Sequence, residues 1–210
     1  MLKIWLSTCP DDFADEYDQI EEMFHRGLSR LILYKRKASD YTYEKWILSL
    51  PEEFRDKVFV RGTPDLAEQL DVRGCVCDVR SLTGDVPESW KRTSCIALCH
   101  SLDELQNLPE WLSGAIFGPI FPSEFASEPL ACLSKEYSMD ELRKILEPVA
   151  NKIPLIAWGG LDEDNVAQIK SLPLKGISVI GGIWNYADPI NAFIKLSRVC
   201  ASNNFESKSI

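Results

Sequence analysis

Two pairs of adjacent glycines mark positions where the backbone itself could bind an anion. Gly159-Gly160 follows the apolar run IPLIAW, and Gly181-Gly182 ends the run KGISVIGG. Glycine has no Cβ, so backbone N–H groups beside it can approach phosphate oxygens closely. Tight turns also use glycine, and that interpretation remains open. If the two runs are neighbouring strands, both pairs lie at one end of a sheet and favour a single phosphate-binding site.

A second group of residues could bind another anion, such as a diphosphate. The segment 34–37 reads YKRK, and Arg61 and Arg80 follow later strand-like runs. Clustered cations are well suited to phosphate oxygens, although a solvated loop would have the same composition. Lys35 and Lys37 alternate onto one face of an extended segment, and Tyr34 and Arg36 onto the other. We therefore predict Lys35 as a catalytic residue that binds the anion, and Lys37 and Arg61 as substrate-binding residues.

Two further side chains are candidates for proton transfer and metal binding. His100 has an imidazole whose ordinary pKa suits acid–base work near neutral pH, although it could instead pack beside a helix capped by Ser101. Asp78 ends an apolar run and could hold Mg²⁺ together with substrate phosphates, or pair with Lys35. Ser123 follows another run and is a candidate substrate contact.

Strand-like and helix-like segments alternate along the whole chain. The strand-like runs are apolar throughout, which is typical of parallel strands covered on both faces. They are Leu2–Ser7, Arg30–Lys35, Lys57–Gly62, Arg73–Val79, Ser94–Cys99, Ala115–Ile120, Ile153–Trp158 and Lys175–Gly182. Helical patterns occupy 11–26, 41–50, 64–70, 138–150 and 189–199, and further helices are expected to begin at Ser101 and near Asp162.

Eight such units predict a single-domain (β/α)₈ TIM barrel over residues 1–200, followed by a polar tail over residues 201–210. A doubly wound open sheet is the alternative. In a barrel, catalytic and binding residues gather at the carboxyl ends of the strands. That rule brings all of the candidate residues named above to one end of the molecule.

The composition narrows the function classes. Hydrophobic residues make up 45% of the 210 residues and charged residues 26%, as in ordinary globular proteins. We expect a cytoplasmic protein, because no run approaches the ~20 apolar residues of a membrane span and no signal peptide is evident. A net charge of −9 argues against a nucleic-acid partner. The seven cysteines lack Cys-x-x-Cys pairs and are expected to be reduced core residues. A homo-oligomer remains open, with Trp184 and Tyr186 as candidate contacts or covers of the pocket.

Four stretches together resemble one family. CHSLDEL, FGPIFPS, IPLIAWGGLDEDNV and GISVIGGIWNYADP are similar, in order and spacing, to the motifs of strands five to eight in thiamine-phosphate synthases and the related thiazole tautomerases. The resemblance implies a Mg²⁺-assisted coupling of a pyrimidine diphosphate with a thiazole phosphate, releasing pyrophosphate. It further implies that Gly160 and Gly182 hold the thiazole phosphate and that Lys35 replaces a diphosphate-binding arginine.

The chain departs from that family at several functional positions. Arg61-Gly62 stands for Asn-Asp, Ser81 for a metal-binding aspartate, Leu98 for a serine, Ser123-Glu124-Phe125-Ala126 for Thr-x-Thr-Lys, and Pro119 for the tautomerase histidine. The metal and diphosphate residues are thus substituted. Our prediction is a divergent synthase. A non-catalytic binder or regulator of thiamine precursors, and a tautomerase-like isomerase that uses His100, remain as alternatives.

Overall fold

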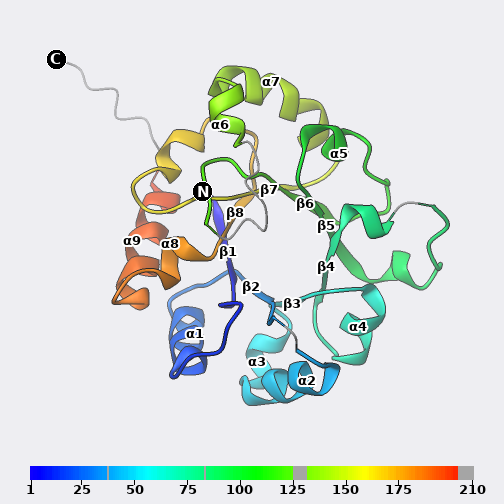
Figure 1. The fold of residues 1–210 in the computed structure, drawn as a ribbon, viewed down its shortest axis with the longest axis vertical. Coiled ribbons are helices and arrows are strands. Elements are labelled where there is room, and N and C mark those ends of the chain that lie inside the picture. The colour runs from blue at the N-terminus through cyan, green and yellow to red at the C-terminus, as the bar shows by residue number, and fades with distance from the viewer. Residues whose placement is uncertain (37, 83, 125–131, 203–210) are drawn as a thin grey trace.

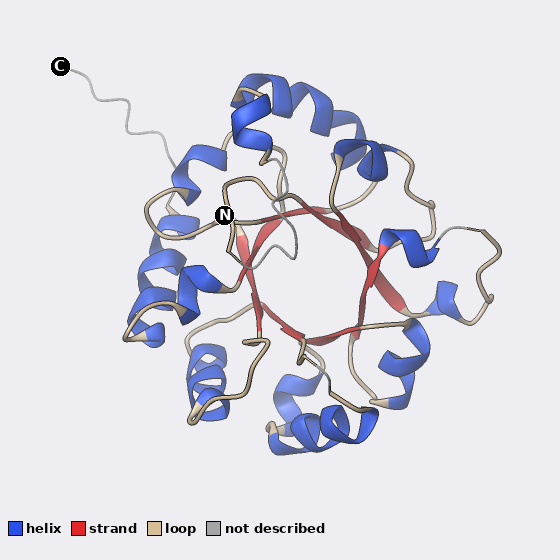
Figure 2. Ribbon diagram, in the orientation of Figure 1, coloured by secondary structure: helices blue, strands red, loops and turns tan. Residues whose placement is uncertain are grey.

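The computed structural model describes residues 1–36, 38–82, 84–124 and 132–202 and contains a closed barrel of eight parallel strands (Figures 1 and 2). Each strand pairs with the next in sequence, and the last pairs with the first. The predicted TIM barrel is confirmed, and the open sheet is excluded. The strands are β1 (Lys3–Ser7), β2 (Arg30–Leu33), β3 (Val58–Arg61), β4 (Gly74–Asp78), β5 (Ser94–Cys99), β6 (Gly114–Phe117), β7 (Leu155–Trp158) and β8 (Gly176–Val179).

Helices surround the barrel on its outer face (Figure 2). The α-helices are α1 (Glu16–His25), α2 (Asp40–Ser49), α3 (Glu52–Arg55), α4 (Pro64–Gln69), α5 (Leu102–Gln106), α6 (Leu133–Glu136), α7 (Met139–Ala150), α8 (Gly181–Trp184) and α9 (Pro189–Ala201). The described ranges also contain three short 3₁₀ helices: η1 (Val79–Leu82), η2 (Trp90–Arg92) and η3 (Val166–Ile169). None of the helices in the described ranges is long and apolar enough to cross a membrane.

The prediction of a helix that begins near Asp162 is wrong, because between β7 and β8 the chain forms only the short 3₁₀ helix η3. Asp162 Oδ1 instead accepts the backbone N–H groups of Asp164 and Asn165, at 3.0 and 3.1 Å. The Asn165 side chain donates to the carbonyl of Gly160 at 2.7 Å. Such local side-chain bonds hold the backbone in a turn and compete with an α-helix.

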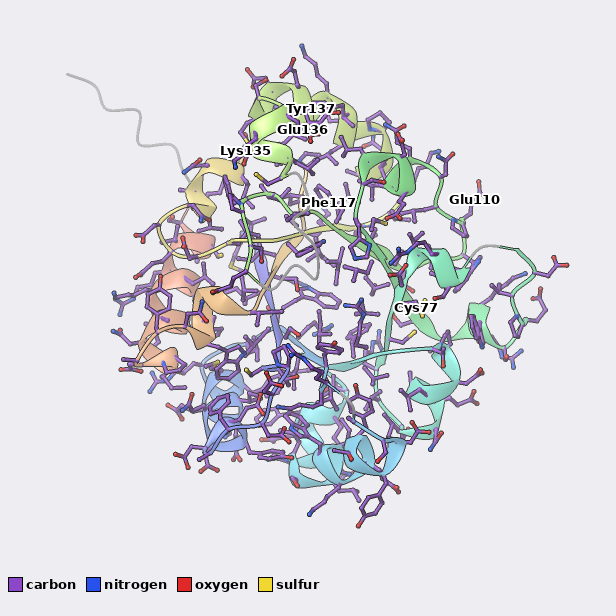
Figure 3. The ribbon with its side chains drawn as sticks, in the orientation of Figure 1. Cys77, Glu110, Phe117, Lys135, Glu136 and Tyr137 are labelled. Atoms are coloured by element: carbon purple, nitrogen blue, oxygen red, sulfur yellow. The ribbon has the colours of Figure 1, made fainter. Side chains whose placement is uncertain are left out.

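The strands divide the core into two layers because their side chains alternate between the two faces. The barrel interior holds an apolar cluster in which Trp5 and Phe59 lie 4.8 Å apart between ring centroids. Residues of the opposite phase pack between the barrel and the helices. Phe117 and Cys77, labelled in Figure 3, belong to this larger outer layer. Both faces of each strand are therefore apolar, as the uninterrupted runs in the sequence predict.

Strand β6 is shorter than the predicted Ala115–Ile120 and ends at Phe117. The peptide bond between Gly118 and Pro119 is cis, and the chain then runs against the end of β7. A Cβ on Gly118 would lie 2.2 Å from the carbonyl oxygen of Trp158. That same carbonyl accepts the N–H of Ile120 at 2.8 Å. Glycine is thus required where the two backbones meet at the mouth of the barrel.

Candidate functional site

A cavity of about 710 Å³ opens at the carboxyl ends of the strands. Its floor is the upper part of the interior cluster, including Ile116 and Trp158. Most of the predicted site residues line it: Arg61, His100, Ser123, Gly159, Gly160, Gly181 and Gly182. Ligand pockets of small-molecule enzymes commonly have this size and this mixture of an apolar floor with polar rims.

The two glycine pairs come together on one wall of this cavity. Gly159 and Gly160 follow β7 with φ of 98° and 59°, values that side-chain-bearing residues rarely adopt. Within the described ranges, the backbone N–H groups of Gly160, Gly181 and Gly182 donate no hydrogen bond. Unused donors beside a cavity favour an anion there. We call the loop segments Gly159–Gly160 and Gly181–Gly182 the glycine cradle.

Close packing also requires glycine in the cradle, independently of any ligand. A Cβ on Gly160 would lie 2.2 Å from the carbonyl oxygen of Pro122, and one on Gly182 would lie 2.0 Å from that of Leu161. The two interpretations open at the sequence level are therefore compatible. The glycines make the loops fit together, and the resulting backbone leaves N–H groups at the cavity wall without a partner among the described residues.

Arg61 lies on the opposite side of the barrel from β7, because three strands lie between β3 and β7 in either direction around the barrel. Its guanidinium carbon is 5.8 Å from the centroid of the Tyr34 ring, a cation–π contact. Thr8 fixes Tyr34 by accepting its backbone N–H at 2.9 Å and donating to its carbonyl at 2.5 Å. Tyr34 also lines the cavity. Burial lowers the pKa of Arg61, and the negative charge of Asp78 opposes that shift.

Lys35 lies away from the cavity. It is 5% exposed and pairs with the buried carboxylate of Glu16, and its Nζ lies 3.0 Å from Asp12 Oδ1. Burial raises the pKa of Glu16, and the contact with Lys35 opposes that rise. Tyr34 faces the cavity in place of Lys35, so the predicted alternation of faces is present with the opposite phase. Lys37 lies outside the described residues.

Asp78 is engaged by Arg80 and does not pair with Lys35. Its two carboxylate oxygens accept from Arg80 Nε at 2.8 Å and from Nη2 at 2.7 Å, and Oδ1 also accepts the Arg80 N–H at 3.0 Å. The hydrogen bond from the Arg80 side chain, above all, lowers the pKa of Asp78 to about 2. The carboxylate is therefore ionised, and both of its oxygens already have donors.

The donor set at this strand end does not fit Mg²⁺. Such sites combine one or two carboxylates with substrate phosphates, and Asp78, the carboxylate present, is occupied by a guanidinium. Across the described ranges, carboxylates and histidines form no cluster of three; the one such group of potential ligands consists of cysteines. Mg²⁺ chemistry implied by the family thus lacks its protein ligands at this position.

His100 lines the cavity beside Trp158, with ring centroids 6.0 Å apart and the rings nearly perpendicular. Its Nδ1 is buried without a hydrogen-bond partner among the described residues, 3.7 Å from Glu104 Oε2. Ser101 accepts the N–H of Glu104 as predicted for a helix cap. In turn, Glu104 Oε2 accepts the backbone N–H of His100 at 2.6 Å, one residue before the cap. The cap therefore fixes the backbone of His100 and leaves its ring at the cavity.

The loops that form the rim of the cavity meet through Glu124 and Asn185, whose side chains hydrogen-bond across the mouth. Ser123 lines the same rim. Tyr186 also lines the cavity, whereas Trp184 donates to the carbonyl of Ser7 at 2.8 Å and packs outside it. Asn185 was not predictable from the sequence, because its role depends on a contact with a residue 61 positions away.

The seven cysteines are all free thiols. Three of them, Cys75, Cys77 and Cys95, have sulfur atoms within 4.8 Å of one another. They belong to the layer between the barrel and the helices, not to the cavity. Cys77 Sγ donates to the carbonyl of Gly62 at 2.7 Å. Their burial matches the expected role as small core side chains.

Comparison with known proteins identifies the family. A family model described as thiamine monophosphate synthase matches residues 5–183. A thiamine-phosphate synthase of Pyrococcus furiosus is 24% identical over 191 residues, 88% of each chain, and one of Lactococcus lactis is 25% identical over 202 residues, 85% of this chain and 87% of the relative. A solved thiamine phosphate pyrophosphorylase from Bacteroides thetaiotaomicron has a TM-score of 0.74 at 24% identity, covering 95% of this chain and 97% of its own, which is a likeness of fold. The chain therefore belongs to the thiamine monophosphate synthase family.

Proposed function

We propose that this protein acts in thiamine biosynthesis as a divergent, synthase-like transferase. Its substrates are hydroxymethylpyrimidine diphosphate and a thiazole phosphate, and its products are thiamine phosphate and pyrophosphate. Family membership supports the pathway and the reaction class. The observation that carries the proposal is the glycine cradle, whose unused N–H groups of Gly160, Gly181 and Gly182 lie at the wall of the cavity.

The cradle is the binding site for the thiazole phosphate in this proposal. Backbone N–H groups accommodate phosphate oxygens without side-chain charge. The carboxylate of Asp162, which also lines the cavity, is held by two N–H groups of its own loop, which reduces its repulsion of the anion. Trp158 and the apolar floor offer flat surfaces for a heteroaromatic ring. Ser123 is a substrate contact at the rim, and Lys37 is retained as a further predicted contact.

The reaction would proceed by departure of the diphosphate from the pyrimidine methylene carbon and attack of the thiazole nitrogen on that carbon. The C–O bond breaks with its electron pair leaving on pyrophosphate, and the C–N bond forms from the nitrogen lone pair. Orientation of the two rings and stabilisation of developing charge supply the rate enhancement. His100 lies at the cavity and would contact the reacting groups or the leaving diphosphate.

A second candidate is a binder of thiamine precursors without turnover. It is favoured by the pairing of Asp78 with Arg80 and of Lys35 with Glu16, which removes two groups expected to act on the diphosphate. An isomerase that uses the unpartnered His100 Nδ1 is a third candidate. These candidates share the cradle and differ in what happens after the phosphate has bound.

Mixing the purified protein with both substrates separates these functions. We expect thiamine phosphate and pyrophosphate by mass spectrometry, and loss of both in Ser178→Asp, which places a carboxylate in the cavity wall beside the cradle. Ser178→Asn is the neutral control of the same shape. Binding of the thiazole phosphate without product would support the binder, and its isomerisation, lost in His100→Gln, would support the isomerase. Absence of both binding and product refutes the proposal.

A further inference from the structure

Among the residues that the structure describes, Arg61 is the one strong cation at the cavity, and no described carboxylate forms an ion pair with it. Arg61 is the sole Lys or Arg among the described residues that line the cavity. In the described ranges, no acceptor takes a hydrogen bond from its guanidinium, and no carboxylate lies within ion-pair distance. Lys35, Arg36 and Arg80, the neighbouring cations, each have carboxylate partners. Half-buried positive charge at a cavity wall favours an anion from solution.

The side chain of Arg61 packs against Tyr34 at the cavity wall. Its guanidinium packs over Tyr34, and Thr8 fixes the backbone of Tyr34 through two hydrogen bonds. A guanidinium presents several N–H donors in one plane and binds phosphate oxygens in pairs. The contact with the Tyr34 ring restricts the side chain, which lowers the entropy lost when an anion binds.

Asp78 does not compete for this cation. Both of its oxygens accept from Arg80, so within the described ranges Asp78 pairs with Arg80 and forms no ion pair with Arg61, and a metal ion would have to compete with the guanidinium for this carboxylate. Asp78 is therefore a poor ligand for a Mg²⁺ ion that would neutralise a bound anion. The guanidinium of Arg61, on the adjacent strand β3, could supply that positive charge instead. The position of Arg61 across from the glycine cradle leaves the apolar floor between two anion-binding walls.

We propose that Arg61 forms a second anion site in the cavity that binds a diphosphate without Mg²⁺. The site is distinct from the glycine cradle, which uses backbone N–H groups. Only the identity of the natural diphosphate compound rests on the proposed function; the site itself is defined by its charge and can be tested with inorganic diphosphate. Replacement of a metal by a fixed guanidinium makes binding independent of divalent cations.

Isothermal titration with inorganic diphosphate in the presence of EDTA tests the site. We expect binding in EDTA with an affinity changed less than threefold by Mg²⁺. Arg61→Gln should weaken it at least tenfold, and Arg61→Lys should give an intermediate value because a single ammonium replaces the planar fork. The matched control is Arg36→Gln, which removes an equal charge from an exposed side chain outside the cavity and should change the affinity less than twofold.

Three outcomes would overturn the proposal: binding that requires Mg²⁺ and disappears in Asp78→Asn, equal binding by Arg61→Gln, or an equal loss in Arg36→Gln. Thermal melts of each variant show whether it is folded, and Arg61→Lys retains the charge if Arg61→Gln unfolds. Failure of the Arg61 site and failure of the proposed transferase function give different results. Diphosphate binding by wild type without product formation leaves the Arg61 site intact and refutes only the transferase. Product formation with unchanged binding by Arg61→Gln refutes only the site.

Discussion

The buried ion pair between Lys35 and Glu16 gives the sharpest test of how this structure uses charge. The two side chains come from the segment after β2 and from the first turn of α1, and they are 5% and 2% exposed. Lys35→Met removes the cation while keeping an unbranched side chain of similar length. It leaves the Glu16 carboxylate buried, with the N–H of Cys9 at 2.9 Å as its remaining hydrogen-bond donor.

The expected loss of stability is large. Removing one member of a buried pair typically costs about 3–5 kcal/mol, because the other charge remains without compensation. Asp12 contributes little, since its side chain is 80% exposed and its contact with Lys35 is screened by water. Domains of this kind have a total stability of about 5–15 kcal/mol, so the variant should unfold at a much lower urea concentration. Adding Glu16→Gln should recover most of the loss, because no buried charge then remains.

Urea denaturation of wild type, both single variants and the double variant measures this coupling. The pH dependence has a definite sign. Without Lys35, the folded-state pKa of Glu16 rises further above its ordinary value of 4.5, so the penalty is full at high pH and shrinks as the pH falls through that raised pKa toward 4.5. A loss below about 1 kcal/mol in Lys35→Met, or a double variant no more stable than the single one, would refute the reasoning. Unchanged diphosphate binding by the folded double variant would further show that Lys35 is structural.

Three further predictions concern single groups. Arg80 lowers the pKa of Asp78 to about 2, so the stability from their contact is present above the ordinary pKa of 3.8 and is lost as the pH falls from there through about 2. Carbon NMR of the Asp78 carboxyl should show this lowered pKa. If the pKa does not move toward 3.8 in Arg80→Met, Arg80 is not its cause. Ser138→Ala removes the hydroxyl that accepts the N–H of Glu141 and donates to Glu141 Oε2 at the start of α7. It should cost about 1 kcal/mol in urea denaturation, whereas an unaltered midpoint would argue against the cap. Gly182→Ala places a Cβ 2.0 Å from the carbonyl of Leu161 and should destabilise by about 1–3 kcal/mol, and a thermal midpoint equal to that of wild type would show that the loops can separate.

The order of elements was predictable because each strand is buried on both faces. Uninterrupted apolar runs such as SCIALC identify the strands, and the intervening amphipathic segments identify the helices that cover them. The same property hides which face points inward. A strand that is apolar on both sides carries no sign of its phase, so the prediction for Lys35 and Tyr34 had the correct alternation and the wrong direction.

The candidate site was predictable where it depends on strand ends and local backbone. The carboxyl-end rule located the glycine cradle, Arg61 and His100 at one cavity, since every parallel strand of a barrel ends on the same side. Side-chain partners across the fold were not predictable. The pairing of Lys35 with Glu16 joins residues 19 positions apart, and Glu124 meets Asn185 across 61 positions.

The sequence by itself determined the barrel, the order of its units and the end at which the cavity opens, because these follow from hydrophobic patterning and glycine positions along the chain. Only the tertiary structure decided which cations are already neutralised. It assigns carboxylates to Lys35 and Arg80 and leaves Arg61 facing the cavity. The physical reason is that the strength of an electrostatic interaction depends on distance and burial in three dimensions, which spacing along the chain does not specify.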